Sequence, residues 1–235
     1  MTDFHSHILP GMDDGSKNSE QSVAMLRRLR EQGVGTVVAT PHFLAGRESV
    51  SDFLDRREKS RARLMKKVPD DVPRILTGAE VSFYSGMGNM TDLGRLCIEG
   101  TNILLLEMPF TRWSSYTVRE LFDISCSHGV TLALAHIDRY MPYQSNDIWT
   151  KLVSGDILLQ ANADYFINFW TRSRAVRMLR SGMIHMIGSD CHNMSSRAPN
   201  FSDAMRHIRK RLGDDYPEHY GRQARIILEN NKNLT

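Results

Sequence analysis

The sequence predicts an α/β fold in which seven parallel strands close into a barrel, with residues 1–235 forming one domain. Short apolar segments alternate with longer amphipathic segments along the whole chain, this unit recurs seven times, and 235 residues is a length that single α/β barrels commonly reach. Strand–helix alternation implies parallel strands joined by right-handed crossovers. Seven units favour barrel closure, and an open sheet is the alternative that the pattern leaves.

The expected strands are short apolar runs bounded by glycine, proline or polar residues. They cover residues 2–8, 36–42, 74–81, 102–108, 131–137, 156–163 and 185–190. Alternate residues of a strand point to the same face, so His5 and His7 should project together, away from Phe4 and Ser6. Two imidazoles side by side suggest a shared ion.

The expected helices are the amphipathic segments between these strands. They cover residues 19–32, 50–67, 115–128, 142–153, 168–181, 200–212 and 218–230. Asn18 or Ser19 is expected to cap the first helix, and Pro217 precedes the last. Residues 82–101 are the least regular part, and we expect either a mobile loop near the functional site or a surface excursion there.

The composition is that of a globular protein. Hydrophobic residues make up 41% and charged residues 24% of the chain, and the formal net charge is only +3, with Lys and Arg scattered among the acids, so nucleic-acid binding is disfavoured. The sequence has no run of 18 apolar residues and no secretory pattern, so we expect a cytoplasmic protein without membrane insertion. Cys97, Cys126 and Cys191 are widely spaced, which favours free thiols over disulfides.

Acids and histidines gather at or just past the C-terminal ends of the expected strands. They are His5, His7, Asp13, Asp14, His42, Glu80, Glu107, His136, Asp190 and His192. In a parallel barrel these ends share one rim, where active sites are built, so the side chains should converge. A single histidine there is more often structural, but Glu80 and Glu107 each follow an apolar run, where an ionised carboxylate must be paired or bound to metal.

This set of donor groups indicates a cluster of metal ions. Imidazole and carboxylate ligands without a thiolate fit Mn, Fe or Zn better than Ca, which prefers oxygen ligands alone. The donors outnumber the ligands that one ion can hold, so we expect two or three ions, with Glu80 as a bridge between them.

Seven short motifs carry a family resemblance. They are DFHSHILPGMDDGS, ATPHF, GAEVS, LLLEMP, LALAHIDRY, LLQANAD and GSDCHN. In this order they resemble the polymerase and histidinol phosphatase (PHP) superfamily, and most closely the manganese-dependent protein-tyrosine phosphatases of bacterial capsule and exopolysaccharide clusters. The resemblance spans roughly residues 1–200. It implies a distorted TIM-like barrel of the PHP type, (β/α)7.

Carried over position by position, the resemblance implies three sets of metal ligands and a phosphate clamp. His5, His7, Glu80 and Asp190 would hold one ion, Glu80, Glu107 and His136 a second, and Asp14, His42 and His192 a third. The implied metal is Mn²⁺, with Fe or Zn as alternatives. Arg139 and Arg197 would hold the phosphate, because forked guanidinium donors suit a phosphate dianion.

The implied reaction is hydrolysis of phosphotyrosine in a protein by a metal-activated hydroxide. Asp190 and His192 are candidates to protonate the leaving oxygen. The implied substrate is the phosphotyrosine-containing tail of a bacterial tyrosine autokinase that controls capsule or exopolysaccharide assembly. Homo-oligomerisation is left open.

Three alternatives compete with this interpretation. Cys191 and Arg197 have the Cys-x5-Arg spacing of cysteine-dependent tyrosine phosphatases, but the segment between them lacks glycine and Asp190 would disfavour the thiolate. A small-molecule phosphomonoesterase of the same fold, such as a histidinol phosphatase, would use the same metal cluster. A catalytically inert metal-binding protein is the third, and the intact set of carboxylates argues against it because they would repel each other without a cation.

Overall fold

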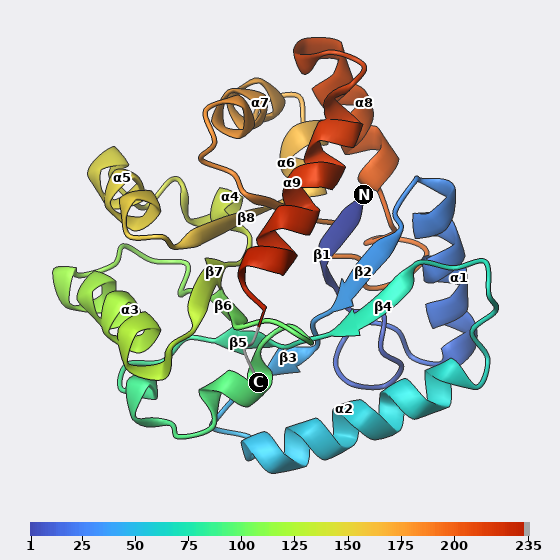
Figure 1. The fold of residues 1–235 in the computed structure, drawn as a ribbon, viewed down its shortest axis with the longest axis horizontal. Helices are drawn as coiled ribbons and strands as arrows, with labels where there is room; N and C mark the ends of the chain where they lie inside the picture. Colours follow the sequence, from blue (N-terminus) through green and yellow to red (C-terminus); the bar gives the residue numbers. More distant parts are fainter. Residues whose placement is uncertain (233–235) are drawn as a thin grey trace.

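Residues 1–232 are described in a computed structural model as two parallel sheets surrounded by helices (Figure 1). The sheets have the strand orders β1–β2–β4 and β3–β5–β6–β7–β8–β9, and the second is curled into a half barrel. All neighbouring strands are parallel, as the strand–helix alternation predicts. The strands are β1 (Thr2–Ser6), β2 (Thr36–Ala39), β3 (His42–Phe43), β4 (Arg74–Thr77), β5 (Glu80–Ser82), β6 (Ile103–Glu107), β7 (Thr131–Leu134), β8 (Leu158–Asn162) and β9 (Met186–Gly188).

Two predicted strands, 36–42 and 74–81, are each interrupted and form two short strands instead of one. The first interruption contains Pro41, which has no N–H to donate to a neighbouring strand. Beyond the interruptions β3 pairs with β5, so that His42 lies directly opposite Glu80. The interruptions therefore bring two predicted metal ligands side by side.

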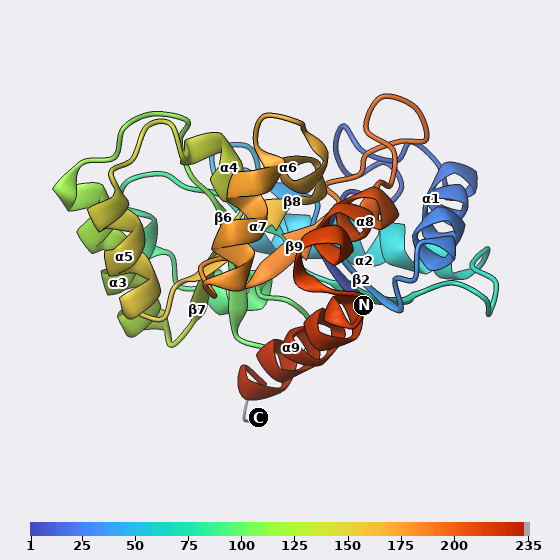
Figure 2. The same ribbon diagram turned by 90° about the horizontal axis from the view of Figure 1, so that it is seen from above.

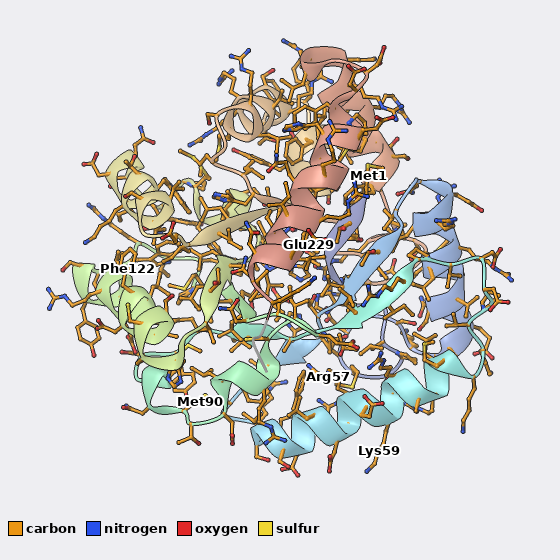
Figure 3. The ribbon with its side chains drawn as sticks, viewed as in Figure 1. Met1, Arg57, Lys59, Met90, Phe122 and Glu229 are labelled. Atoms are coloured by element: carbon orange, nitrogen blue, oxygen red, sulfur yellow. The ribbon has the colours of Figure 1, made fainter. Side chains whose placement is uncertain are left out.

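Helix α2 (Val50–Met65) fixes the second interruption. Arg57 points from this helix toward the sheets, whereas Lys59 points away from them (Figure 3). The Arg57 Nη1 donates a hydrogen bond of 2.7 Å to the carbonyl oxygen of Gly78, between β4 and β5. The arginine thus satisfies a backbone acceptor that the interruption leaves free.

The helices form an outer layer, and α9 (Tyr216–Asn230) closes one end of the molecule (Figures 1 and 2). The Tyr220 hydroxyl of α9 accepts a hydrogen bond from the Ile187 N–H at 2.9 Å and donates one to the Thr2 carbonyl at 3.2 Å, which ties α9 to two strands. The remaining long helices are α1 (Ser19–Glu31), α3 (Ser115–His128), α5 (Asn146–Ser154), α7 (Arg172–Arg180), α8 (Phe201–Leu212) and α9 (Tyr216–Asn230). Asn18, one of the two predicted caps, accepts a hydrogen bond from the Gln21 N–H.

Several predicted boundaries are wrong because short helices follow two strands directly. Helices α4 (Ile137–Tyr140) and α6 (Ala163–Ile167) begin where the predicted strands 131–137 and 156–163 were expected to end. The predicted helices 142–153 and 168–181 correspondingly begin later, with α5 and α7. Residues 82–101 contain two 3₁₀ helices, η1 (Met87–Asn89) and η2 (Leu93–Leu96), whose Met87, Leu93 and Leu96 side chains are buried in the core.

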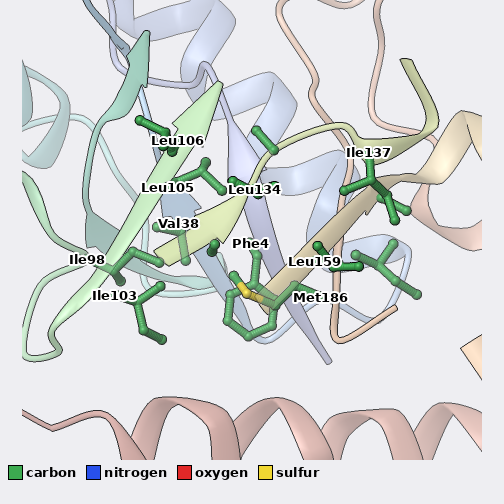
Figure 4. Close-up of a cluster of buried hydrophobic side chains, with 14 of the residues drawn as sticks. Phe4, Val38, Ile98, Ile103, Leu105, Leu106, Leu134, Ile137, Leu159 and Met186 are labelled. Carbon is green, nitrogen blue, oxygen red and sulfur yellow. The ribbon is translucent and has the colours of Figure 1, made fainter. Parts of the chain in front are cut away.

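Apolar side chains of the strands meet inside the molecule, above α9 (Figure 4). Phe4, Val38, Ile103, Leu134 and Met186 come from five different strands and are fully buried. This core fills the space between the amino-terminal halves of the strands and α9, so the polar side chains of the same strands are left at the opposite, carboxyl ends.

Two further expectations concern the chain as a whole. Within residues 1–232, no helix combines the length and the apolar character needed to cross a bilayer. Cys97 and Cys191 are buried, Cys126 is exposed, and all three are free thiols, as predicted.

Candidate metal centre

His42 and Glu80 begin the short strands β3 and β5, and the other predicted metal ligands lie at or beyond the carboxyl ends of strands. The structure brings all nine side chains together. Their donor atoms form four groups, in each of which the atoms lie within 4.8 Å of one another. The groups are His7, Asp14, His42 and His192; His5, His136 and Asp190; His5, His7 and Glu80; and His42, Glu80 and Glu107. Each predicted ligand belongs to at least one group.

These groups differ in part from the three ligand sets that the resemblance implies. The third implied set recurs intact and gains His7. Asp190 groups with His136, with 3.8 Å between the Asp190 Oδ2 and the His136 Nδ1, and with His5, with 3.7 Å between Oδ1 and Nε2. Glu107 groups with His42 and Glu80, and its Oε1 also lies 3.4 Å from the His136 Nε2.

The Glu80 carboxylate is the centre of the cluster and is fully buried. Its Oε2 lies 3.2 Å from the His5 Nε2, 3.3 Å from the His7 Nε2 and 3.0 Å from the His42 Nδ1. Its Oε1 lies 2.5 Å from the His136 Nε2. Despite these short distances, Oε2 has no partner with hydrogen-bond geometry. A buried carboxylate oxygen surrounded by nitrogen atoms in this way fits a shared cation better than a set of hydrogen bonds.

Acceptors outside the cluster fix how His5 and His7 present their nitrogen atoms. The His5 Nδ1 lies 3.1 Å from the Gln160 Oε1, which also accepts a hydrogen bond from the backbone N–H of His136. The His7 Nδ1 lies 2.7 Å from the Asp13 Oδ2. Because both acceptors are oxygen atoms, the proton of each neutral ring lies on Nδ1, and the Nε2 lone pairs point into the cluster.

The same arrangement recurs at His136 and His192. The His136 Nδ1 faces the Asn162 Oδ1 at 3.3 Å, and the His192 Nδ1 faces the Asp190 carbonyl oxygen at 2.9 Å. The His192 Nε2 and the Asp190 Oδ1 are buried without hydrogen-bond partners, like the Glu80 Oε2. Four imidazoles therefore offer Nε2 to the same small volume, as metal ligands with fixed orientation do.

Two of the predicted ligands have a backbone conformation that L-residues rarely adopt. His136 and Asp190 have φ angles of 39° and 52°, in the left-handed region. Such strain costs about 1–3 kcal/mol per residue and persists where the surrounding structure enforces it. At His136 it ends β7, and at Asp190 it turns the chain after β9, so both side chains face the cluster.

Two glycines leave room for the side chains of His5 and His7. A Cβ at Gly15 would lie 2.4 Å from the His7 Cβ, and a Cβ at Gly188 would lie 2.4 Å from the His5 Cβ. Real Cβ atoms do not approach this closely, so only glycine fits at either position without displacing β1. The second glycine of the PGMDDGS motif, Gly15, is thus explained by packing against His7.

Protons take the place of cations in the metal-free site. Burial lowers the pKa of His7, but the hydrogen-bonded Asp13 carboxylate and the nearby carboxylates of Asp190 and Glu80 outweigh the effect of burial and raise that pKa well above its ordinary value. Burial raises the pKa of Glu80, but His5 and His136 hold it well below the usual range. Burial and the charge of His7 lower the pKa of His192 to about 4. A metal would have to displace protons from His7 and His136, whose pKa values are raised, whereas His192 holds no proton near pH 7.

The two predicted phosphate-binding arginines border the cluster and reach solvent. Arg139 and Arg197 each donate from Nη2 to the Asp190 Oδ2, at 2.7 and 2.9 Å. Their side chains are 37% and 38% exposed, so each guanidinium has donors available to a ligand that enters from solvent. The Phe110 ring lies 5.8 Å from the Arg139 guanidinium carbon and covers one side of it.

The cysteine-dependent alternative is contradicted by the position of Cys191. Its side chain is fully buried, and burial, with the Asp3 and Asp190 charges, raises the pKa of its thiol far above the ordinary value. A thiolate nucleophile requires the opposite shift and access to the substrate.

The chain as a whole matches one known protein family. Residues 1–234 match the model of the CpsB/CapC family of capsular polysaccharide synthesis. The chain belongs to the CpsB/CapC family.

Its relatives in the CpsB/CapC family include named enzymes. The tyrosine-protein phosphatase CpsB of Streptococcus pneumoniae is 30% identical over 233 residues, which cover 91% of each chain. The tyrosine-protein phosphatase YwqE of Bacillus subtilis is 27% identical over 98% of this chain and 92% of its own. One crystal structure comes from a study of YwqE and CpsB that describes them as unique metal-dependent tyrosine phosphatases. It has a TM-score of 0.81 to this structure and 27% sequence identity, and the match covers 99% of this chain and 96% of the other.

The sequence analysis missed several residues that hold the predicted ligands of this CpsB/CapC chain in place. Asp13 was placed on the rim but given no role beside Asp14, and it holds His7. Gln160 and Asn162 stand two apart in β8, as His5 and His7 do at the end of β1, and this spacing of polar residues in an apolar strand could have revealed them.

Proposed function

We propose that this chain is a metal-dependent protein-tyrosine phosphatase of capsule or exopolysaccharide synthesis. The observation that carries the proposal is the Glu80 Oε2, buried within 3.3 Å of three imidazole nitrogens and without a hydrogen-bond partner. The names of the relatives CpsB and YwqE supply the substrate class, phosphotyrosine in a protein. The histidinol-phosphatase-like alternative has no comparable support, because those relatives are named tyrosine-protein phosphatases.

The residues present fit a cluster of two or three ions. Nitrogen and oxygen donors without a thiolate suit Mn²⁺, with Fe or Zn as alternatives. The proposed ligands are His5, His7, Asp14, His42, Glu80, Glu107, His136, Asp190 and His192. When bound, such ions would lower the pKa of water and offset the negative charge of a phosphate ester.

The chain's own contribution to the reaction is to bind and orient the phosphate. Arg139 and Arg197 share one oxygen of Asp190, which aims both guanidinium groups toward the cluster. In this position their remaining N–H groups can hold the phosphoryl oxygens while charge develops on them.

Asp190 and His192 are poorly suited to donate a proton to the leaving group. Burial raises the pKa of Asp190, but His7, His5 and His136 outweigh burial and hold that pKa far below its usual range. The pKa of His192 is lowered to about 4. Neither side chain therefore holds a proton near pH 7. We assign both to metal binding. A tyrosine leaving group, with a pKa near 10, needs less protonation than an alkoxide.

We also propose that residues 1–235 form one domain whose two sheets together make a PHP-type (β/α)7 barrel. The sheet edges approach at β1 and the segment after β9, where Ser6 forms a parallel bridge with Cys191. The Asp190 N–H donates to the His5 carbonyl at 2.8 Å, and the His7 N–H donates to the Cys191 carbonyl at 2.9 Å. These contacts support closure across the predicted first and seventh strands.

The test is hydrolysis of p-nitrophenyl phosphate and of a phosphotyrosine peptide by metal-stripped protein, before and after Mn²⁺ is added, with EDTA as the control. Metal-dependent activity on both substrates is expected. Activity that survives chelation would refute the metal mechanism, and metal-dependent activity on the small ester alone would favour a metabolite phosphatase. A tail peptide of a bacterial tyrosine autokinase, the substrate we expect, is the natural peptide to use.

A further inference from the structure

A groove of about 570 Å³ lies beside the metal centre and is lined by none of its ligands. Two segments form it, residues 44–47 after β3 and residues 82–84, which begin with the last residue of β5. Its volume lies within the range of about 300–1,000 Å³ that is usual for ligand sites. Leu44, Ala45, Phe83 and Tyr84 give it apolar walls.

The groove is continuous with the proposed catalytic site. Leu44 stands two residues after the ligand His42, and Ser82 stands two residues after the ligand Glu80. The Ser82 hydroxyl donates to the Glu107 Oε2 at 3.4 Å, and the Phe83 N–H donates to the Glu107 carbonyl at 2.8 Å. Ser82, which lines the groove, therefore contacts Glu107, a proposed metal ligand, so a substrate held at the metals can extend into the groove.

The outer end of the groove carries an uncompensated positive charge. Within residues 1–232, no carboxylate lies within 4.0 Å of the Arg47 guanidinium. The neighbouring Glu48 is bound instead to Arg56, with 2.6 Å and 2.9 Å between their atoms. Arg47 is exposed, so its donors are free for an acidic group on a ligand.

We propose that this groove binds the peptide segment next to the phosphotyrosine, with an apolar side chain against Leu44 and Phe83 and a carboxylate at Arg47. The proposal rests on the phosphatase function proposed above and adds a preference for acidic peptides. Tyr84, which is 40% exposed, and the exposed Gly46 leave the groove open to solvent, so that a continuous peptide chain can pass through it.

The test compares peptides that carry one glutamate or one lysine at each of the two positions on either side of phosphotyrosine. With Mn²⁺-loaded protein, Arg47→Glu should lower kcat/KM for the best glutamate peptide by about fivefold, the size expected for an exposed charge pair. The same variant should raise kcat/KM for the matching lysine peptide. Gly46→Phe should lower kcat/KM for all of the peptides, because a Cβ at Gly46 meets no atom within 4 Å and the added ring can occupy the groove.

The matched control is Arg211→Glu, an exposed arginine of α8 outside this groove, which should change none of these values. Turnover of p-nitrophenyl phosphate should be unchanged in all three variants, because this ester has no flanking peptide. If the wild type lacks metal-dependent turnover of that ester, the phosphatase function is wrong. The groove proposal is wrong if the wild type hydrolyses the ester but Arg47→Glu leaves kcat/KM for the glutamate and lysine peptides unchanged. It is also wrong if Arg47→Glu lowers the turnover of the ester and of the peptides alike.

Discussion

The Nε2 atoms of His5 and His7 lie 3.2 Å apart in the interior of the protein. Gln160 and Asp13 occupy the other nitrogen of each ring, so two lone pairs would face each other if both rings were neutral. In the metal-free protein a proton can lie between the two Nε2 atoms, and in the metal-loaded protein a metal ion can take its place. This competition between protons and metal at one place leads to the first two predictions.

Replacing Asp13 with Asn should weaken metal binding without unfolding the protein. The variant keeps the shape of the side chain but removes the negative charge that faces the His7 Nδ1, which lies 2.7 Å from the Asp13 Oδ2. Losses of about 10- to 100-fold in metal affinity or activity are usual for such orienting partners. Calorimetric titration with Mn²⁺ measures the affinity, and Asp203→Asn on the surface of α8 is the control. An unchanged affinity would show that Asp13 does not orient His7.

The stability of the metal-free protein should be greatest between about pH 4.5 and 6.5. Burial lowers the pKa of His136, but Glu80 and Glu107 raise it from 6.5 to about 9, so its stabilising contribution is complete below pH 6.5 and is lost as the pH rises toward 9. The pKa of Glu80 lies well below 4.5, so its contribution is complete above pH 4.5 and is lost as the pH falls further.

Urea unfolding of the metal-free protein across this pH range measures the effect. Metal binding needs neutral imidazoles, so the added stability from Mn²⁺ should grow from about pH 6 to about pH 9, opposite to the trend of the metal-free protein. A metal-induced stabilisation that does not change with pH would contradict proton displacement.

Gly188→Ala should destabilise the fold and damage the site together. The new Cβ would lie 2.4 Å from the His5 Cβ and 2.9 Å from the Gln160 Nε2, so β1 and β9 must separate. We expect a loss of about 1–3 kcal/mol in the free energy of unfolding, together with weaker metal binding. Gly94→Ala is the matched control, because a Cβ there meets no atom within 4 Å. Equal stability of the two variants would refute the packing argument.

Arg139→Ala should lower kcat/KM for p-nitrophenyl phosphate by about 100-fold or more, because a donor to the developing phosphoryl charge is lost.

Cys191→Ser should keep most of the activity, since this thiol is buried and its pKa is raised. Steady-state kinetics with matched metal content measures both variants. Inactive Cys191→Ser protein with a normal fold and metal content would overturn the metal mechanism.

The sequence by itself predicted the alternation of parallel strands and helices and the residues that come together at the candidate site. The alternation of segments predicts parallel strands, and their expected carboxyl ends hold the acids and histidines. The structure gathers the donor atoms of these residues into four groups, within each of which the atoms lie within 4.8 Å of one another. The spacing of His5 and His7 predicts that they project together, because side-chain direction in a strand depends only on local geometry.

Only the tertiary structure decided how these residues divide the work. Asp13 and Asp14 are adjacent and chemically identical, yet Asp13 holds the His7 Nδ1, whereas Asp14 groups with His42 and His192. The interruption before β3, which places His42 opposite Glu80, and the left-handed conformations of His136 and Asp190 were likewise not predicted. These features depend on contacts between segments far apart in the chain, and a local pattern of residue types carries no information about which of those contacts form.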